Sequence, residues 1–317
     1  MRVFHKLDDI PAGFGSTLVS VGNFDGVHRA HRKVLDTIVE RARNQGLRSM
    51  AVTFEPHPMR ILRPDSAFKL LTPTPEKVRL LASTGLDATL LLPFGRDLSL
   101  MTPHRFAHDI LTRALRAKEV HEGYNFHFGH RAEGDVDLLA KFGREMGFKV
   151  EVYSEMRLRG EPVSSSHIRK LISAGCVSRA RHLLARPFSI LSTAGRGHGR
   201  GSKQTVPTIN LSRYEELVPK YGVYITRARV GNEYFDAVTN VGDRPTFGPD
   251  SFAIETHLLN FHPLDIVAET EVEIHFLCRI RDEIKFPSVE MLLEQIGKDI
   301  RTATHYFQLL AVNARSR

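Results

Sequence analysis

The sequence has little cysteine: its 317 residues include only two, Cys176 and Cys278, which lie far apart along the chain. Two such residues provide no disulfide framework, so a disulfide-stapled secreted fold is excluded and a reducing cytoplasm is expected. Long apolar runs are also missing. A membrane span needs about 18 to 20 apolar residues, and no stretch of the sequence approaches this length. The first residues mix acids with bases and have no apolar signal core, which favours a soluble, cytoplasmic protein.

Several familiar ligand-binding motifs are missing as well. No HExxH zinc motif is present, and the glycine-rich stretch 195–203 fits neither GxxxxGKS/T nor GxGxxG in any register. Zinc-protease, Walker and Rossmann interpretations therefore fail on spacing.

The chain carries a formal net charge of +8, which favours anionic partners such as nucleotides, nucleic acid or anionic lipid. Its lysines and arginines are scattered, however, without the dense block typical of a nucleic-acid-binding tail. The length suits two domains, and 42% hydrophobic with 25% charged residues describes an ordinary globular protein. Charge alone does not decide between these partners.

Short apolar runs alternate with amphipathic stretches from residue 17 to about residue 155, which predicts an α/β fold with a doubly wound, mostly parallel sheet. Ligands of such sheets bind beyond the carboxyl ends of the strands. The segments 22–31, 54–58 and 123–129 each follow a predicted strand and are expected on one rim. The predicted strands are 17–21, 49–54, 88–92, 119–121 and 149–153, and the predicted helices are 32–45, 74–84, 103–117 and 134–147.

The segment 22–31 joins the first strand to a helix and ends in His28 and His31. Their i, i+3 spacing predicts that both lie on one face of the first helical turn, where free N–H groups and the helix dipole favour a phosphate. Two alternatives remain open at this point: a zinc site that lacks its third ligand, or two ordinary surface histidines among the 16 in the chain. A later segment, 163–172, is predicted to be the start of a helix capped by serine. It either offers Ser164, Ser165 and Arg169 to a phosphate or is a plain capped helix.

The pattern changes after a helix at 177–185 and becomes rich in strands, so the domain boundary is predicted near residue 186, between 1–185 and 186–317. Segments 222–230 and 234–241 flank the turn pair Gly231-Asn232, which is typical of a hairpin. Further strands at 253–261 and 270–280 and a long amphipathic helix at 287–310 predict a small antiparallel β-barrel with a terminal helix.

Glycines alternate with basic residues at the start of this second part and include Gly199, Arg200 and Gly201. Their backbone N–H and guanidinium groups suit phosphates, although the stretch also reads as a flexible basic loop or a short RNA-binding tract. The following Thr208 and Asn210 offer oxygen ligands that suit a hard cation such as Mg²⁺.

Eight segments carry a family resemblance, in the expected order. In the first half, 22–31 resembles GNFDGVHxGH, 54–58 resembles FEPHP, 123–129 resembles GxD/NFxFG and 163–169 resembles ISSTxIR. In the second half, 207–210 resembles PTAN, 220–224 resembles KYGVY, 240–247 resembles NVGxRPTF and 255–257 resembles ETH. Together these motifs are similar to those of the bifunctional riboflavin kinase/FMN adenylyltransferases, the prokaryotic FAD synthetases.

This resemblance implies two Mg²⁺-dependent transferase activities: phosphorylation of riboflavin to FMN, and adenylylation of FMN by a second ATP to give FAD and pyrophosphate. In the first domain it implies that His28 and His31 stabilise charge on the α-phosphate. It also implies that Ser164, Ser165 and Arg169 hold the leaving phosphates. Asn23 is then expected to contact the nucleotide, and Asn125 to lie toward the flavin. In the second domain it implies that Thr208 and Asn210 hold Mg²⁺-ATP, that the loop with Gly199, Arg200 and Gly201 covers the phosphates, and that Glu255 accepts the ribityl proton.

The sequence departs from the family at a few positions. Ala30 replaces the glycine of HxGH and adds a methyl group near a phosphate, while Thr205 stands where the kinase loop has glycine, a position that suits β-branched residues poorly. Both activities are expected, with an adapted or slower kinase loop. The expected partners are riboflavin, FMN, FAD and ATP, with no nucleic acid or membrane, in a monomer or weak homo-oligomer.

Three rival functions remain. The first is an enzyme in which only the adenylyltransferase works. The second is transfer to another acceptor, as in class I aminoacyl-tRNA synthetases, although residues 164–169 do not resemble their lysine-rich loop. The third is an RNA-binding protein, which leaves the histidine pair and Glu255 without a role and predicts a steep salt dependence of RNA affinity.

Overall fold

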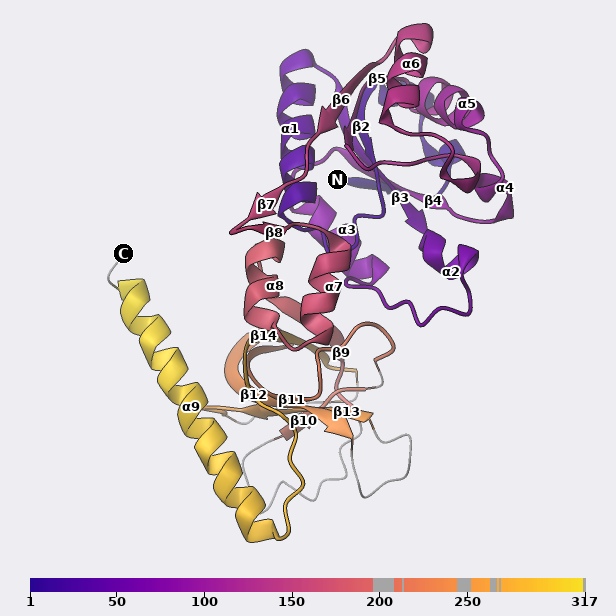
Figure 1. The fold of residues 1–317 in the computed structure, drawn as a ribbon. Coiled ribbons are helices and arrows are strands. Elements are labelled where there is room, and N and C mark those ends of the chain that lie inside the picture. The colour runs from indigo at the N-terminus through magenta and orange to yellow at the C-terminus, as the bar shows by residue number, and fades with distance from the viewer. Residues whose placement is uncertain (196–207, 213, 244–251, 263–266, 268, 316–317) are drawn as a thin grey trace. The chain divides into compact units, whose positions relative to one another are not determined.

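The computed structural model describes residues 1–195, 208–212, 214–243, 252–262, 267 and 269–315. The chain forms two compact units, Met1–Ser165 and Ser166–Arg317, and each is described by itself below (Figure 1).

A six-stranded parallel sheet forms the centre of the first unit. Its order is β1-β4-β3-β2-β5-β6, and every neighbouring pair is parallel. The strands are β1 (Arg2–Phe4), β2 (Thr17–Val21), β3 (Arg48–Glu55), β4 (Ala88–Pro93), β5 (Ala117–Gly123) and β6 (Lys149–Tyr153). The connecting helices are α1 (Arg29–Gln45), α2 (Pro58–Leu62), α3 (Thr74–Ala82), α4 (Arg96–Ser99), α5 (Pro103–Arg105) with the π-helical turns of Phe106–Ala114, and α6 (Val136–Met146). A small hairpin of β7 (Arg157–Leu158) and β8 (Glu161–Pro162) follows β6.

Two apolar clusters cover the two faces of this sheet. On one face Leu18 packs in a cluster with Leu35 of α1 and Leu81 of α3. On the other face Val19 belongs to a cluster that includes Leu139 of α6. Since side chains alternate along a strand, the continuous apolar run of β2 serves both clusters, and the predicted doubly wound architecture is confirmed.

The structure corrects the predicted helix at 103–117, which ends at Ala114. Arg116 adopts a left-handed conformation with φ of 49°, which turns the chain so that Ala117 enters β5 beside Thr17 of β2. The periodicity of the sequence did not reveal this turn because apolar residues continue across it.

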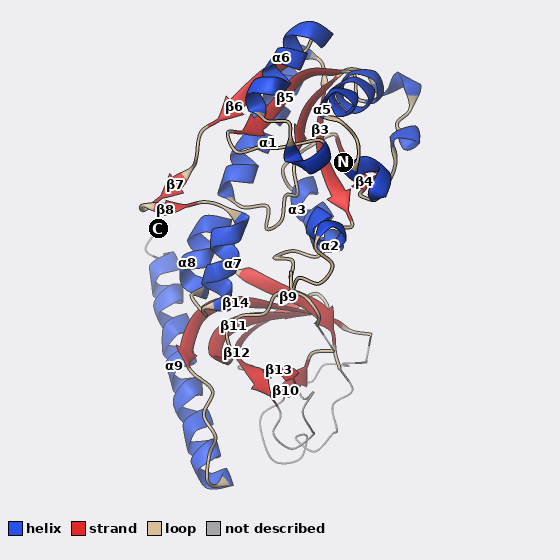
Figure 2. Ribbon diagram, turned by 45° about the vertical axis from the view of Figure 1, so that its right-hand side comes forward, coloured by secondary structure: helices blue, strands red, loops and turns tan. Residues whose placement is uncertain are grey.

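A curved antiparallel sheet forms the second unit, in the order β10-β13-β12-β11-β14-β9 (Figure 2). The predicted small antiparallel barrel is present as a half-barrel. A bridge between Ala194 and Leu211 links the ends of its two edge strands. The strands are β9 (Phe188–Thr193), β10 (Thr208–Asn210), β11 (Gly222–Val230), β12 (Glu233–Asp243), β13 (Phe252–Leu258) and β14 (Glu271–Arg281). The expected two-residue turn Gly231-Asn232 joins β11 to β12.

Helices flank this half-barrel. Helix α8 (Val177–Leu184) packs against β9 and β14 and follows α7 (Ser165–Ser173). The long helix α9 (Val289–Arg315) lays Ala303 and Phe307 on Val223 and Ile225 of β11. The expected terminal helix is therefore present and extends to Arg315.

A ladder of three buried threonines crosses the middle of the half-barrel. The Thr239 hydroxyl lies 2.7 Å from that of Thr226 on β11 and 3.0 Å from that of Thr256 on β13. Each hydroxyl can donate one bond and accept others, so the ladder satisfies polar groups that burial would otherwise leave unpaired.

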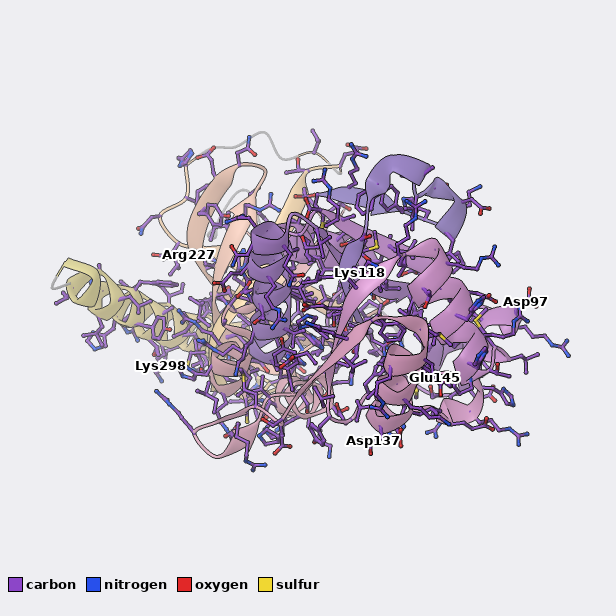
Figure 3. The ribbon with its side chains drawn as sticks, turned by 90° about the horizontal axis from the view of Figure 1, so that it is seen from above. Asp97, Lys118, Asp137, Glu145, Arg227 and Lys298 are labelled. Carbon is purple, nitrogen blue, oxygen red and sulfur yellow. The ribbon has the colours of Figure 1, made fainter. Side chains whose placement is uncertain are left out.

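Charged side chains of both signs lie on the outside of each unit (Figure 3). Labelled examples are Asp97, Lys118 and Glu145 in the first unit, and Arg227 and Lys298 in the second; all are exposed. Within the described parts of the chain, no helix combines the length and apolar character needed to span a membrane.

Candidate active sites

A tight turn between β2 and α1 forms the centre of the first candidate site. Phe24 and Val27 adopt left-handed backbone conformations with φ of 46° and 37°, although both side chains are buried in the core. Such conformations cost about 1 to 3 kcal/mol each for residues of this type and persist only where the surroundings hold them. The packing of these two side chains therefore fixes the course of the chain from Gly22 to His28.

His28 caps the start of α1. Its Nδ1 accepts a hydrogen bond of 3.4 Å from the backbone N–H of His31. The neutral ring of His28 therefore carries its proton on Nε2, from which it can donate to a ligand. The rings of His28 and His31 stack with their centres 3.6 Å apart, so the predicted pairing of the two side chains on one face is confirmed.

His31 lies between its partner and the edge of the Phe24 ring, with ring centres 5.2 Å apart. Burial lowers the pKa of His31 well below its usual 6.5, and the nearby His28 and Lys77 lower it further. Its Nδ1 is buried and has no hydrogen-bond partner in the described parts of the chain. The ring is therefore neutral at pH 7.

Position 30 lies in the first turn of α1, where Ala30 replaces the glycine of the family motif. The residue has an ordinary helical backbone and not a left-handed one. An alanine therefore fits the backbone at this position.

The order of the strands explains where this site lies. Strand β2 sits between β3 and β5, and the chain reverses its direction of travel across the sheet between β2 and β5. Ligands of such sheets bind at this point, beyond the carboxyl ends of the strands. The turn that contains Asn23 follows β2, and the turn that contains Asn125 follows β5; both side chains are exposed.

Backbone contacts tie two further segments to the turn. The buried carboxylate of Asp25 accepts hydrogen bonds from the backbone N–H groups of Leu71 and Thr72, at 3.1 and 3.0 Å. The Ser165 hydroxyl donates to the backbone oxygen of Asp25 at 2.8 Å. The predicted phosphate ligand Ser165 is therefore attached to the same turn as the histidines.

The other two members of the predicted phosphate-binding set lie near this contact in the sequence. Ser164 is half-buried and immediately precedes α7, in the first unit. Arg169 is half-buried in α7 and belongs to the second unit. The roles of both remain predictions.

Two buried ionisable residues at this site were not predicted. Lys77 of α3 is 1% exposed and donates to the backbone oxygen of Asn23. Glu122 of β5 accepts a 2.6 Å hydrogen bond from Val21 N–H, and burial raises its pKa well above 4.5. The sequence held a signal for Lys77, since its spacing from Leu80 and Leu81 places it on the buried face of a helix.

A row of polar residues crosses the half-barrel in the second unit. Asn210 of β10 lies directly opposite Glu255 of β13, which in turn lies opposite Asn240 of β12. Thr208 lies opposite His257, two residues along on the same face. Directly opposite residues have Cβ atoms about 4.5 to 5.5 Å apart and diagonal ones lie about 7 to 8 Å apart. The strand register therefore brings Asn210 close to Glu255 and places Thr208 diagonally across from Glu255 on the same face.

The donors in this row suit a magnesium ion. A hydroxyl, an amide oxygen and a carboxylate oxygen are the hard ligands that Mg²⁺ prefers. No cluster of three or more His, Cys, Asp or Glu side chains that suits a metal occurs within the described ranges. The predicted loop residues Gly199, Arg200 and Gly201, together with Thr205, lie outside the described residues.

Family models match both parts of the chain: FAD synthetase over residues 12–167 and riboflavin kinase over residues 184–307. With the observed fold, these matches define a class of two-unit transferase, with a nucleotidyltransferase-type parallel sheet followed by a kinase-type half-barrel. The chain belongs to the bifunctional riboflavin kinase/FMN adenylyltransferase family.

The relatives align with almost the whole chain. The bifunctional riboflavin kinase/FMN adenylyltransferase of Escherichia coli (strain K12) is 33% identical over 98% of this chain and 98% of its own. The protein of the same name from Pseudomonas fluorescens is 31% identical over 96% of this chain and 97% of its own. A crystal structure titled a macrolide-efflux protein from Streptococcus pneumoniae has a TM-score of 0.85 at 26% identity, covering 95% of this chain and 98% of that one.

Proposed function

We propose that this chain makes FAD from riboflavin in two steps, with the kinase step in the half-barrel and the adenylylation step at the histidine pair. The first step transfers the γ-phosphoryl group of ATP to the ribityl 5′-hydroxyl and gives FMN. The second joins FMN to the AMP part of another ATP and gives FAD and pyrophosphate. The observation that carries the second step is the stacked pair of His28 and His31 at the start of α1.

Adenylylation begins when an oxygen of the FMN phosphate attacks the α-phosphorus of ATP. A new P–O bond forms there as the bond to the bridging oxygen of pyrophosphate breaks, so no covalent enzyme intermediate is needed. His28 donates from Nε2 to the α-phosphate oxygens as negative charge builds on them, and the neutral His31 holds that ring in place.

The remaining predicted residues of this site bind the substrates. Ser164, Ser165 and Arg169 hold the β- and γ-phosphates that leave, Asn23 contacts the nucleotide, and Asn125 lies toward the flavin. The bond from Ser165 to the Asp25 backbone supports the assignment of Ser165, because it holds that hydroxyl at the turn that carries the histidines. Catalysis then comes mainly from positioning and charge stabilisation.

In the kinase step Glu255 accepts the proton of the ribityl 5′-hydroxyl as that oxygen attacks the γ-phosphorus of ATP. Thr208 and Asn210 hold Mg²⁺, which when bound neutralises charge on the ATP phosphates. Their position beside Glu255 in the strand register supports this assignment. The loop with Gly199, Arg200 and Gly201 is proposed to cover the phosphates.

We also propose that the protein acts in the cytoplasm, on small molecules alone, as a monomer or weak homo-oligomer. Exposed charges of both signs support only the part of this proposal that excludes nucleic acid, because nucleic acid binding favours a concentrated basic surface (Figure 3).

The test is an incubation of the purified chain with Mg²⁺-ATP and either riboflavin or FMN, with the flavins separated by chromatography over time. The expected result is FMN followed by FAD from riboflavin, and FAD alone from FMN, with both reactions abolished by EDTA. FAD from FMN without FMN from riboflavin would refute the kinase half of the proposal. A lack of product from either flavin would refute both halves.

A further inference from the structure

Lys77 is a buried lysine beside the histidine pair to which none of the proposed steps gives a role. It lies in α3 and is only 1% exposed, whereas lysines rarely lose contact with water without a specific partner. The side chain of Glu55 accepts a hydrogen bond from the Thr74 hydroxyl in the first turn of the same helix. The carboxyl end of β3 therefore fixes the part of α3 from which Lys77 extends.

The ammonium group of Lys77 joins two strand ends. Its Nζ donates to the backbone oxygen of Asn23 and to the Thr53 hydroxyl, both at 3.3 Å. Thr53 in turn donates to the same Asn23 oxygen at 3.1 Å. The backbone oxygen of Asn23 thus accepts two hydrogen bonds. These bonds hold the peptide of Asn23, the residue that is predicted to contact the nucleotide.

The charge of Lys77 also reaches the histidines. Burial lowers the pKa of Lys77, while the carboxylates of Asp25 and Glu55 raise it and so favour the charged form. The groups that lower the pKa of His31, besides burial, are its neighbour His28 and Lys77. The positive charge of Lys77 therefore opposes protonation of His31.

We propose that Lys77 is a positioning residue for adenylylation, which anchors the turn through Asn23 and supplies a buried positive charge behind the histidine pair. This charge has two effects. It adds to the effects of burial and of His28 that keep His31 neutral, with its ring stacked on His28, and it lowers the energy of the negative charge that builds on the α-phosphate. This inference rests on the proposed adenylylation step.

Three variants separate the charge of Lys77 from its hydrogen bonds. Lys77→Met keeps a similar volume and removes the charge together with both hydrogen bonds of Nζ. Thr53→Val removes the two hydrogen bonds of the Thr53 hydroxyl and keeps the charge. Lys118→Met makes the same exchange as Lys77→Met at an exposed site (Figure 3). FAD formation from FMN is measured from pH 5 to pH 9, and riboflavin phosphorylation by the same chain serves as an internal control.

Lys77→Met is expected to lower kcat for FAD formation about tenfold or more, with riboflavin phosphorylation unchanged. It should also move the acid limb of the pH profile to higher pH. Without the positive charge of Lys77, His31 gains its proton more easily and its pKa rises. Thr53→Val should lower kcat by a smaller factor and leave the acid limb in place, and Lys118→Met should change neither. A Lys77→Met enzyme with the wild-type kcat and acid limb would overturn the proposal.

Titration of the His31 imidazole by NMR tests the charge effect without substrate. The pKa of His31 should lie below 6.5 in the wild type and rise in Lys77→Met; an unchanged value overturns the proposal, even in a chain that makes FAD. If Lys77→Met does not fold, as its circular dichroism would reveal, an unchanged kcat in Thr53→Val refutes the anchoring role. A wild-type chain that makes no FAD would instead refute the proposed function, so the two failures are distinct.

Discussion

Glu119 offers a test of how a buried charge stabilises the first unit. The residue lies in β5 and is 4% exposed. Its carboxylate accepts hydrogen bonds from Arg41 at 3.0 Å, from Gln45 at 2.9 Å and from His121 at 3.0 Å. Burial alone raises the pKa of Glu119, but the hydrogen bonds from Gln45, Arg41 and His121 outweigh it and lower this pKa from 4.5 to about 2.

The size of the effect follows from this difference in pKa. Each pH unit between the folded and unfolded values is worth about 1.4 kcal/mol, so the charged form of Glu119 contributes on the order of 3 kcal/mol to folding at pH 7. Because the folded pKa is the lower one, this contribution is present above about pH 4.5 and is lost as the pH falls toward 2. Glu119→Gln should therefore destabilise the unit by about 3 kcal/mol at pH 7 and by less at pH 3.

Hydrogen exchange of the β5 amides measures this locally, by comparing wild type and variant at the same pH. A loss of 3 kcal/mol corresponds to a fall in protection of roughly a hundredfold. Glu145→Gln, the same exchange at an exposed position, is the control and should change protection little. Equal effects of Glu119→Gln at pH 7 and pH 3, or none at pH 7, would refute the reasoning.

Two further substitutions test contacts that hold the sites. Asp25→Asn should lower the free energy of unfolding by about 2 to 3 kcal/mol, because a neutral amide replaces the carboxylate that accepts hydrogen bonds from the Leu71 and Thr72 N–H groups. Thermal denaturation measures this loss, and an unchanged melting temperature would contradict the prediction. Thr239→Val should cost about 1 to 3 kcal/mol, because it removes the shared partner of the buried Thr226 and Thr256 hydroxyls. Urea denaturation measures this second loss, and a variant as stable as the wild type would show that the ladder does not stabilise the half-barrel.

The spacing of apolar and polar residues within short segments was sufficient to predict most of the fold. The apolar run from Thr17 to Val21 and the alternating helices predicted the parallel sheet, because each element carries its own periodicity. The spacing of His28 and His31 likewise predicted their shared face, since three residues is close to one helical turn. The turn at Gly231-Asn232 followed from the conformations that this residue pair favours.

Contacts between distant segments were beyond the reach of local pattern. Nothing near Asp25 in the sequence indicates that its carboxylate accepts from the Leu71 and Thr72 amides, because that contact depends on how the chain passes over the sheet. The pairing of Asn210 with Glu255 needed the register of two strands that are not consecutive in the sequence. Lys77 was missed because a lysine within an amphipathic helix is usually exposed.

The central claim is that the two steps use separate sets of residues, one around the histidine pair and the other around Glu255. The most direct measurement compares His31→Gln and Glu255→Gln in the full chain, with both activities assayed on each. His31→Gln should lose FAD formation from FMN and keep phosphorylation of riboflavin, whereas Glu255→Gln should lose phosphorylation and keep FAD formation from supplied FMN. Loss of both activities in both folded variants, or of neither, would contradict the account.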